Sequence, residues 1–86
     1  MTLLTKIGPD KVALKLLKNR RIIDIEETKY YHDLTEVLIS ILDKILKRNK
    51  IDTTALNLFK IQEKTGKNST SYKIVAAFIE GLKTKS

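Results

Sequence analysis

The chain has 86 residues, a formal net charge of +7 and no cysteine. This length favours a single domain over residues 1–86 with a modest core, and the lack of cysteine excludes a disulfide framework. With one histidine, His32, no ligand set for a structural zinc is available, so we expect neither a metal nor a cofactor. No apolar run approaches the roughly 20 residues of a membrane span. We therefore expect a cytoplasmic protein that makes no membrane contact.

The charge is unevenly distributed along the chain. Residues 1–43 contain seven basic and seven acidic side chains, whereas residues 44–86 contain ten basic and three acidic ones. The whole net charge of +7 therefore lies in the second half. Such an asymmetry indicates a polyanion or an acidic protein surface as the partner.

The first predicted helix begins at the Gly-Pro-Asp sequence of residues 8–10 and ends at about Asn19. Proline suits the first helical position, and an acidic residue suits the positive end of the helix dipole. Residues 1–7 form either an arm that docks on this helix or a continuation of it. On a helical wheel, three cations share one side of the helix: Lys11, Lys15 and Lys18.

The second predicted helix is a long one from about Ile25 to Arg48. Residues 24–27 and 33–36 both have the spacing of a capping box, so two starting points stay open. We prefer one continuous helix because two tyrosines extend its apolar face. That face spans about 200°, more than a surface helix needs, so the helix is either central or dimerises. Four of its residues are candidates for a protein interface: Tyr30, Tyr31, Ile39 and Leu46.

Two shorter helices are predicted to follow. Asp52 caps the third, which ends at about Lys64, and Asn68 or Ser69 caps the fourth, which ends at about Lys83. Residues 83–86 form a frayed tail. Four helices with short connections predict an all-α fold, a compact bundle with one long central helix.

The turn between the last two helices is similar to that of helix-turn-helix regulators, since Thr65 and Gly66 precede a Ser/Thr-capped helix. The pattern expects a small residue where this chain has Gln62. The outer face of the following helix presents Lys73 and Glu80 but few other groups that read bases. A dimeric helix-turn-helix regulator of transcription is therefore the alternative hypothesis and not the first.

Basic residues gather at the end of the second predicted helix and along the third. Helices that turn back on each other would bring these cations together, where they could follow a phosphate backbone without reading bases. All five aromatic residues lie on predicted core faces, so we do not expect base stacking. The candidate nucleic-acid-binding residues are Lys44, Lys47, Arg48, Lys50, Lys60, Lys64, Lys67 and Lys73.

In size, charge and predicted helix content, the chain resembles the small, basic, all-helical accessory subunits of archaeal B-family DNA polymerases. The resemblance rests on no motif, so it transfers no functional residue; it implies an adaptor on a replication complex. Abundant isoleucine and lysine suit either an AT-rich genome or a heat-adapted protein. Isolated glycines and a lone histidine provide no phosphate loop and no catalytic triad, so we expect no enzyme.

The expected function is thus that of a non-catalytic accessory subunit in DNA replication or another nucleic-acid process. The expected partners are a larger protein, such as a DNA polymerase, and the nucleic-acid backbone. A homodimer stays open as well.

Overall fold

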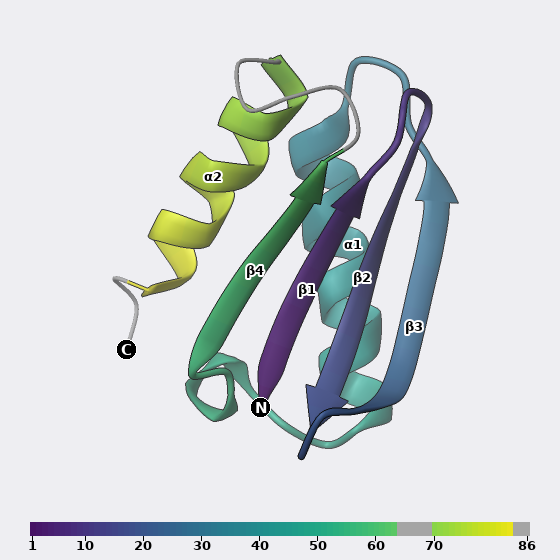
Figure 1. Cartoon of the computed structure of the whole chain (residues 1–86). Helices are drawn as coiled ribbons and strands as arrows, with labels where there is room; N and C mark the ends of the chain where they lie inside the picture. Colours follow the sequence, from purple (N-terminus) through teal and green to yellow (C-terminus); the bar gives the residue numbers. More distant parts are fainter. Residues whose placement is uncertain (64–69, 84–86) are drawn as a thin grey trace.

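The chain folds into a mixed α/β structure in the computed structural model, which describes residues 1–63 and 70–83. The prediction of an all-α bundle is therefore wrong. The described elements are β1 (Thr2–Ile7), β2 (Lys11–Lys18), β3 (Arg21–Lys29), α1 (Leu34–Arg48), a 3-10 turn (Thr53–Ala55), β4 (Leu58–Glu63) and α2 (Thr70–Lys83). The strands form one sheet in the order β3-β2-β1-β4 (Figure 1).

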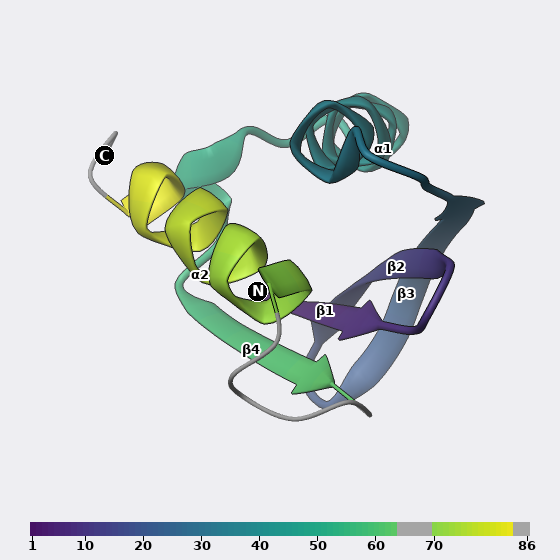
Figure 2. The same cartoon turned by 90° about the horizontal axis from the view of Figure 1, so that it is seen from above.

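The sheet combines an antiparallel meander with one parallel strand. β1 pairs antiparallel with β2, and β2 pairs antiparallel with β3. β4 pairs parallel with β1 on its other side, after the chain has crossed over through α1. Figure 2 shows both helices on the same side of the sheet. No described helix covers the opposite face, which we call the bare sheet face.

Residues 11–18 form a strand where a helix was predicted. Val12, Leu14 and Leu16 are buried, and they alternate with residues on the bare sheet face. Such a period of two belongs to a strand, and pairing with Ile7 and Leu3 of β1 buries these side chains under the helices. The predicted arm over residues 1–7 contains β1, one of the two inner strands of the sheet.

A tight turn joins β2 to β3. Asn19 and Arg20 both have positive φ angles, 54° and 67°. Two consecutive left-handed residues suit a two-residue hairpin, since this conformation follows the right-handed twist of the strands. Asparagine tolerates it, whereas arginine adopts it at a cost in free energy.

The predicted helix from Ile25 to Arg48 is correct only in its second part. Residues 21–29 are strand β3, and α1 begins at Leu34, directly after Asp33. The buried side of α1 consists of Leu34, Leu38, Ile41, Leu42 and Ile45.

The two tyrosines before α1 differ in their surroundings. Tyr30 is buried, and its hydroxyl group lies 3.1 Å both from the Gly8 carbonyl oxygen and from Ser71 Oγ. Tyr31 is 81% exposed, so its placement on a core face was wrong.

The third predicted helix is also wrong. Asp52 does act as a cap, but only for the short turn of residues 53–55, and the chain then enters β4. The predicted fourth helix is confirmed as α2, although its proposed caps at residues 68 and 69 and the predicted tail at 84–86 lie outside the described residues. A helix-turn-helix needs a helix directly before its turn, but residues 58–63 form strand β4. The alternative hypothesis of a helix-turn-helix regulator therefore lacks the first helix of that motif.

Candidate nucleic-acid interface and docking groove

The predicted basic residues do not form one cluster. Lys44, Lys47 and Arg48 lie on the last turns of α1, at the end of the molecule where β4 begins (Figure 1). Lys73 lies near the start of α2, at the opposite end. Lys50 follows α1, and Lys60 lies on the bare sheet face. Lys64 and Lys67 are outside the described residues.

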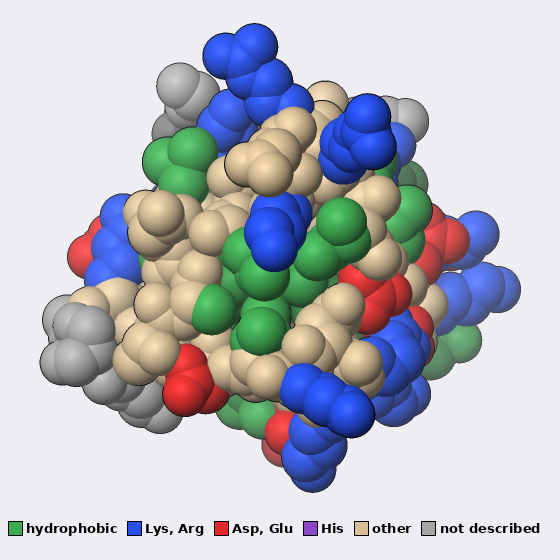
Figure 3. Space-filling model, turned by 90° about the horizontal axis from the view of Figure 1, so that it is seen from below, with side chains coloured by type: hydrophobic (Ala, Val, Ile, Leu, Met, Phe, Trp, Pro, Cys, Tyr) green, Lys and Arg blue, Asp and Glu red, His purple; other side chains and the backbone are tan. Residues whose placement is uncertain are grey.

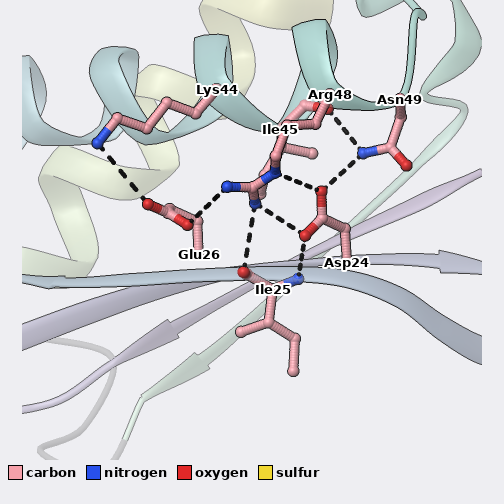
Figure 4. Close-up of polar contacts among 7 residues, drawn as sticks. All are labelled: Asp24, Ile25, Glu26, Lys44, Ile45, Arg48 and Asn49. Atoms are coloured by element: carbon pink, nitrogen blue, oxygen red, sulfur yellow. Dashed lines mark hydrogen bonds and ion pairs between the residues drawn. The ribbon is translucent and has the colours of Figure 1, made fainter.

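Arg48 binds two acidic residues of β3 (Figure 4). Its Nη2 atom lies 2.8 Å from Asp24 Oδ1 and its Nε atom 3.1 Å from Asp24 Oδ2, while Nη1 lies 3.0 Å from Glu26 Oε2. The amide of Asn49 also donates to Asp24, at 2.8 Å. This fork of charge-assisted bonds connects the end of α1 to the sheet. Arg48 therefore has structural partners in β3.

The neighbouring lysines of α1 are also paired. Lys44 Nζ lies 3.7 Å from Glu26 Oε1, and Lys47 Nζ lies 2.9 Å from Asp43 Oδ2. Of the four predicted cations at residues 44–50, Lys50 alone has no ion pair with a described residue. The sequence alone could not show that Glu26 and Asp24 of β3 supply acidic partners for Lys44 and Arg48.

The Arg48–Asp24 pair predicts a pH dependence of stability. Hydrogen bonds from the Arg48 guanidinium group hold the pKa of Asp24 below its usual value. Because the pKa is lower in the folded state, the carboxylate stabilises the fold above the unfolded-state pKa, and this contribution is lost as pH falls through the folded-state pKa. We therefore expect Asp24→Asn to be less stable than the wild type at neutral pH and to lose less stability below about pH 4.

Denaturant unfolding at neutral pH and at about pH 2 measures this difference. Asp10→Asn is the control, since Asp10 is exposed and makes no ion pair with a described residue. It should lose as much stability on acidification as the wild type. An Asp24→Asn protein with the same acid sensitivity as the wild type would contradict the role of this pair.

The bare sheet face carries a group of lysines that have no acidic partner among the described residues. The pairing of the strands places one residue from each of β3, β2, β1 and β4 side by side in a row across this face. One row reads Ile25, Lys15, Leu4, Lys60, and the next reads Glu27, Ala13, Lys6, Gln62. Five lysines face this side with one acidic residue, and none of the five forms an ion pair with a described residue: Lys6, Lys11, Lys15, Lys29 and Lys60. We call these five lysines the cationic sheet face.

A hollow of about 620 Å³ lies at one end of this face. Its apolar part consists of Leu4, Leu17 and Leu58, and two cations, Arg20 and Lys60, also line it. Figure 3 views the molecule from the end at which β1 and β4 begin, where Lys and Arg side chains surround an area of hydrophobic side chains. The strained turn thus places Arg20 beside the bare sheet face.

A second surface lies between α1 and α2, on the helix side of the molecule. It is a groove of about 380 Å³ with mainly apolar walls. Two of the predicted interface residues, Ile39 and Leu46, line it, whereas Tyr30 and Tyr31 do not. We call it the docking groove, and its residues are Ile39, Leu42, Asp43 and Leu46 of α1 with Ala77, Phe78, Gly81 and Leu82 of α2.

Comparison with known proteins finds no protein-family model and no curated sequence that matches the chain. Neither α1 nor α2 has the length and apolar character that a membrane span needs. Within residues 1–63 and 70–83, no three His, Cys, Asp or Glu side chains lie together as metal ligands would.

Proposed function

We propose that this protein is a non-catalytic adaptor subunit of a nucleic-acid-processing complex. One observation carries the proposal: the molecule separates two surfaces of different chemistry on its two sides. The bare sheet face has five lysines and one glutamate among exposed apolar side chains such as Ile25 and Leu58, whereas the docking groove has mainly apolar walls. The first surface suits a phosphate backbone, and the second suits a protein.

Lysine on a sheet face is suited to sequence-independent contact. Lys15 and Lys60 are two strands apart, or about 10 Å, and Lys11 is about 13 Å along the strand from Lys15. Flexible ammonium groups at such distances can reach several phosphates without a fixed geometry. Phe59, the one aromatic residue of the four strands, lies on the helix side, so the face supplies no base stacking.

The test compares two triple variants with the same net charge. The first, Lys15→Gln with Lys29→Gln and Lys60→Gln, removes three cations from the cationic sheet face. The second, Lys47→Gln with Lys50→Gln and Lys73→Gln, removes three of the cations that sequence alone had suggested, all outside that face. Binding to a duplex DNA of random sequence is measured by anisotropy over a range of salt concentrations.

We expect the first variant to bind at least about tenfold more weakly at low salt, with a salt slope reduced by about 3. The second should bind within about threefold of the wild type. Equal losses in both variants would show that only net charge matters and would reject the cationic sheet face as the site. A wild-type protein that binds neither duplex nor single strands at low salt would reject a nucleic-acid partner, and an acidic protein would then be the candidate.

A further inference from the structure

The second half of α2 contains a glycine that no described neighbour requires. Gly81 lies in the last turn of α2 and is exposed, and a Cβ atom placed there would meet no described atom outside its own stretch of helix within 4 Å. Ala77, one turn earlier, is also exposed and lines the same groove. Although Phe78 and Leu82 also line the α2 wall of the groove, Ala77 and Gly81 leave a small-residue recess in it, where a foreign side chain can approach the backbone closely.

The facing wall carries a projecting apolar side chain. Ile39 of α1 is 56% exposed, although its neighbour Leu38 is fully buried. An isoleucine with so much exposed surface gains free energy when another surface covers it. The docking groove thus combines a knob on α1 with a shallow recess on α2. A knob and a recess on one patch are what a two-fold symmetric contact requires, because each copy then supplies both parts.

The charges beside the groove also balance. Asp43 pairs with Lys47 at 2.9 Å, and Glu80 pairs with Lys83 at 3.5 Å. These four side chains sum to zero, so two copies can approach here although each chain carries +7. The cationic sheet face, which would repel its copy, lies on the far side of the molecule. A polyanion, in contrast, finds no excess of positive charge in the groove.

We infer that the docking groove binds the docking groove of a second copy of this chain. α1 and α2 of both copies then form one helical layer between two sheets, with Ile39 of each copy against Ala77 and Gly81 of the other. The inference rests on the proposed function in one respect: the proposal assigns a protein partner to the docking groove, and the inference names that partner. In such a dimer the two cationic sheet faces point outward in opposite directions, so one dimer can hold two nucleic-acid segments.

Sedimentation equilibrium without nucleic acid tests the inference. The wild type should shift from one to two chain masses as its concentration rises. Ile39→Glu and Gly81→Arg should each stay monomeric at concentrations where the wild type is dimeric. Ile25→Glu is the matched control, because Ile25 is 48% exposed on the bare sheet face, and this variant should dimerise like the wild type. Far-ultraviolet circular dichroism checks that every variant is folded.

A crosslinking experiment gives an independent measurement. The chain has no native cysteine, so an Ala77→Cys protein carries one thiol in the groove. A short bismaleimide should join two Ala77→Cys chains but not two Ile25→Cys chains, which carry the thiol on the bare sheet face.

A wild type that stays monomeric up to its solubility limit would overturn the inference, and so would dimers that persist in Ile39→Glu and Gly81→Arg. These outcomes are separate from the nucleic-acid test. Monomers that still bind DNA through the cationic sheet face would reject the second copy and retain the proposed function. Dimers that bind no DNA would reject the proposed function and retain the second copy as the partner of the docking groove.

Discussion

Replacing Leu38 with alanine is expected to lower the free energy of unfolding by about 3 kcal/mol. Leu38 lies in the first half of α1 and is fully buried, within the core between α1 and the sheet. The substitution removes buried apolar surface and leaves a cavity between helix and sheet. For a domain of this size, the melting temperature should fall by about 10 °C or more. Thermal and denaturant unfolding measure the change.

Ile39→Ala is the matched control, because it makes a similar truncation one residue further along the same helix. Ile39 is 56% exposed, so the loss should be below about 1 kcal/mol in the monomer. The measurement is made at a concentration where the chain is monomeric, so that dimer formation does not contribute. Equal losses for the two variants would contradict the observed orientation of α1, in which one neighbour faces the sheet and the other faces outward.

Replacing Thr5 with valine is expected to raise the free energy of unfolding by about 1–2 kcal/mol. Thr5 is fully buried in β1, and its hydroxyl group has no hydrogen-bond partner among the described residues. Its neighbours on the helix side of the sheet are apolar, with Leu14 beside it on β2 and Ile61 on β4. Valine has nearly the same shape as threonine but has a methyl group in place of the hydroxyl group. It therefore avoids the cost of burying an unpaired polar group.

Thr2→Val is the control for this prediction, since it makes the same change in the same strand. Thr2 is only partly buried and faces the bare sheet face, where water can reach its hydroxyl group. Its effect should be within about 0.5 kcal/mol. A loss of stability in Thr5→Val, measured by denaturant unfolding, would show that the buried hydroxyl group has a partner such as an internal water molecule.

The two surfaces give the adaptor proposal a consistent geometry. The cationic sheet face lies on one side of the sheet, and the docking groove, inferred to meet a second copy, lies between α1 and α2 on the other side. Under the proposal, one dimer would hold nucleic acid on each of its two outer faces through the cationic sheet faces.

The error in the predicted fold has a specific origin in residues 11–18. A separation of four residues, as between Lys11 and Lys15, places two side chains on one face of a helix and also on one face of a strand. The same stretch has Val12, Leu14 and Leu16 at every second position, which is a strand signal, although the apolar residues Ala13 and Leu17 interrupt the alternation. A helix-start pattern at residues 8–10 outweighed that signal, although the Gly-Pro-Asp sequence instead joins two strands.

Acidic residues misled the prediction in a second place. The spacing of Asp24 and Glu27 matches a capping box, but Asp24 binds Arg48, which lies 24 residues later in the chain. No local pattern identifies a partner so distant. The same contact explains the loss of the predicted basic cluster, since β3 provides the acids that pair with the end of α1.

By itself, the sequence determined the net charge, the lack of cysteine chemistry, α2, the second part of the predicted long helix and the cap at Asp52. These are properties of composition or of residues within a few positions of each other, which local physics decides. Tertiary structure alone decided that residues 2–7, 11–18, 21–29 and 58–63 are strands, because strands are stabilised by partners far along the chain. It also decided which lysines share a face, since the register of the sheet places Lys15 and Lys60 in one row on either side of β1, although Lys60 lies 45 residues later in the chain.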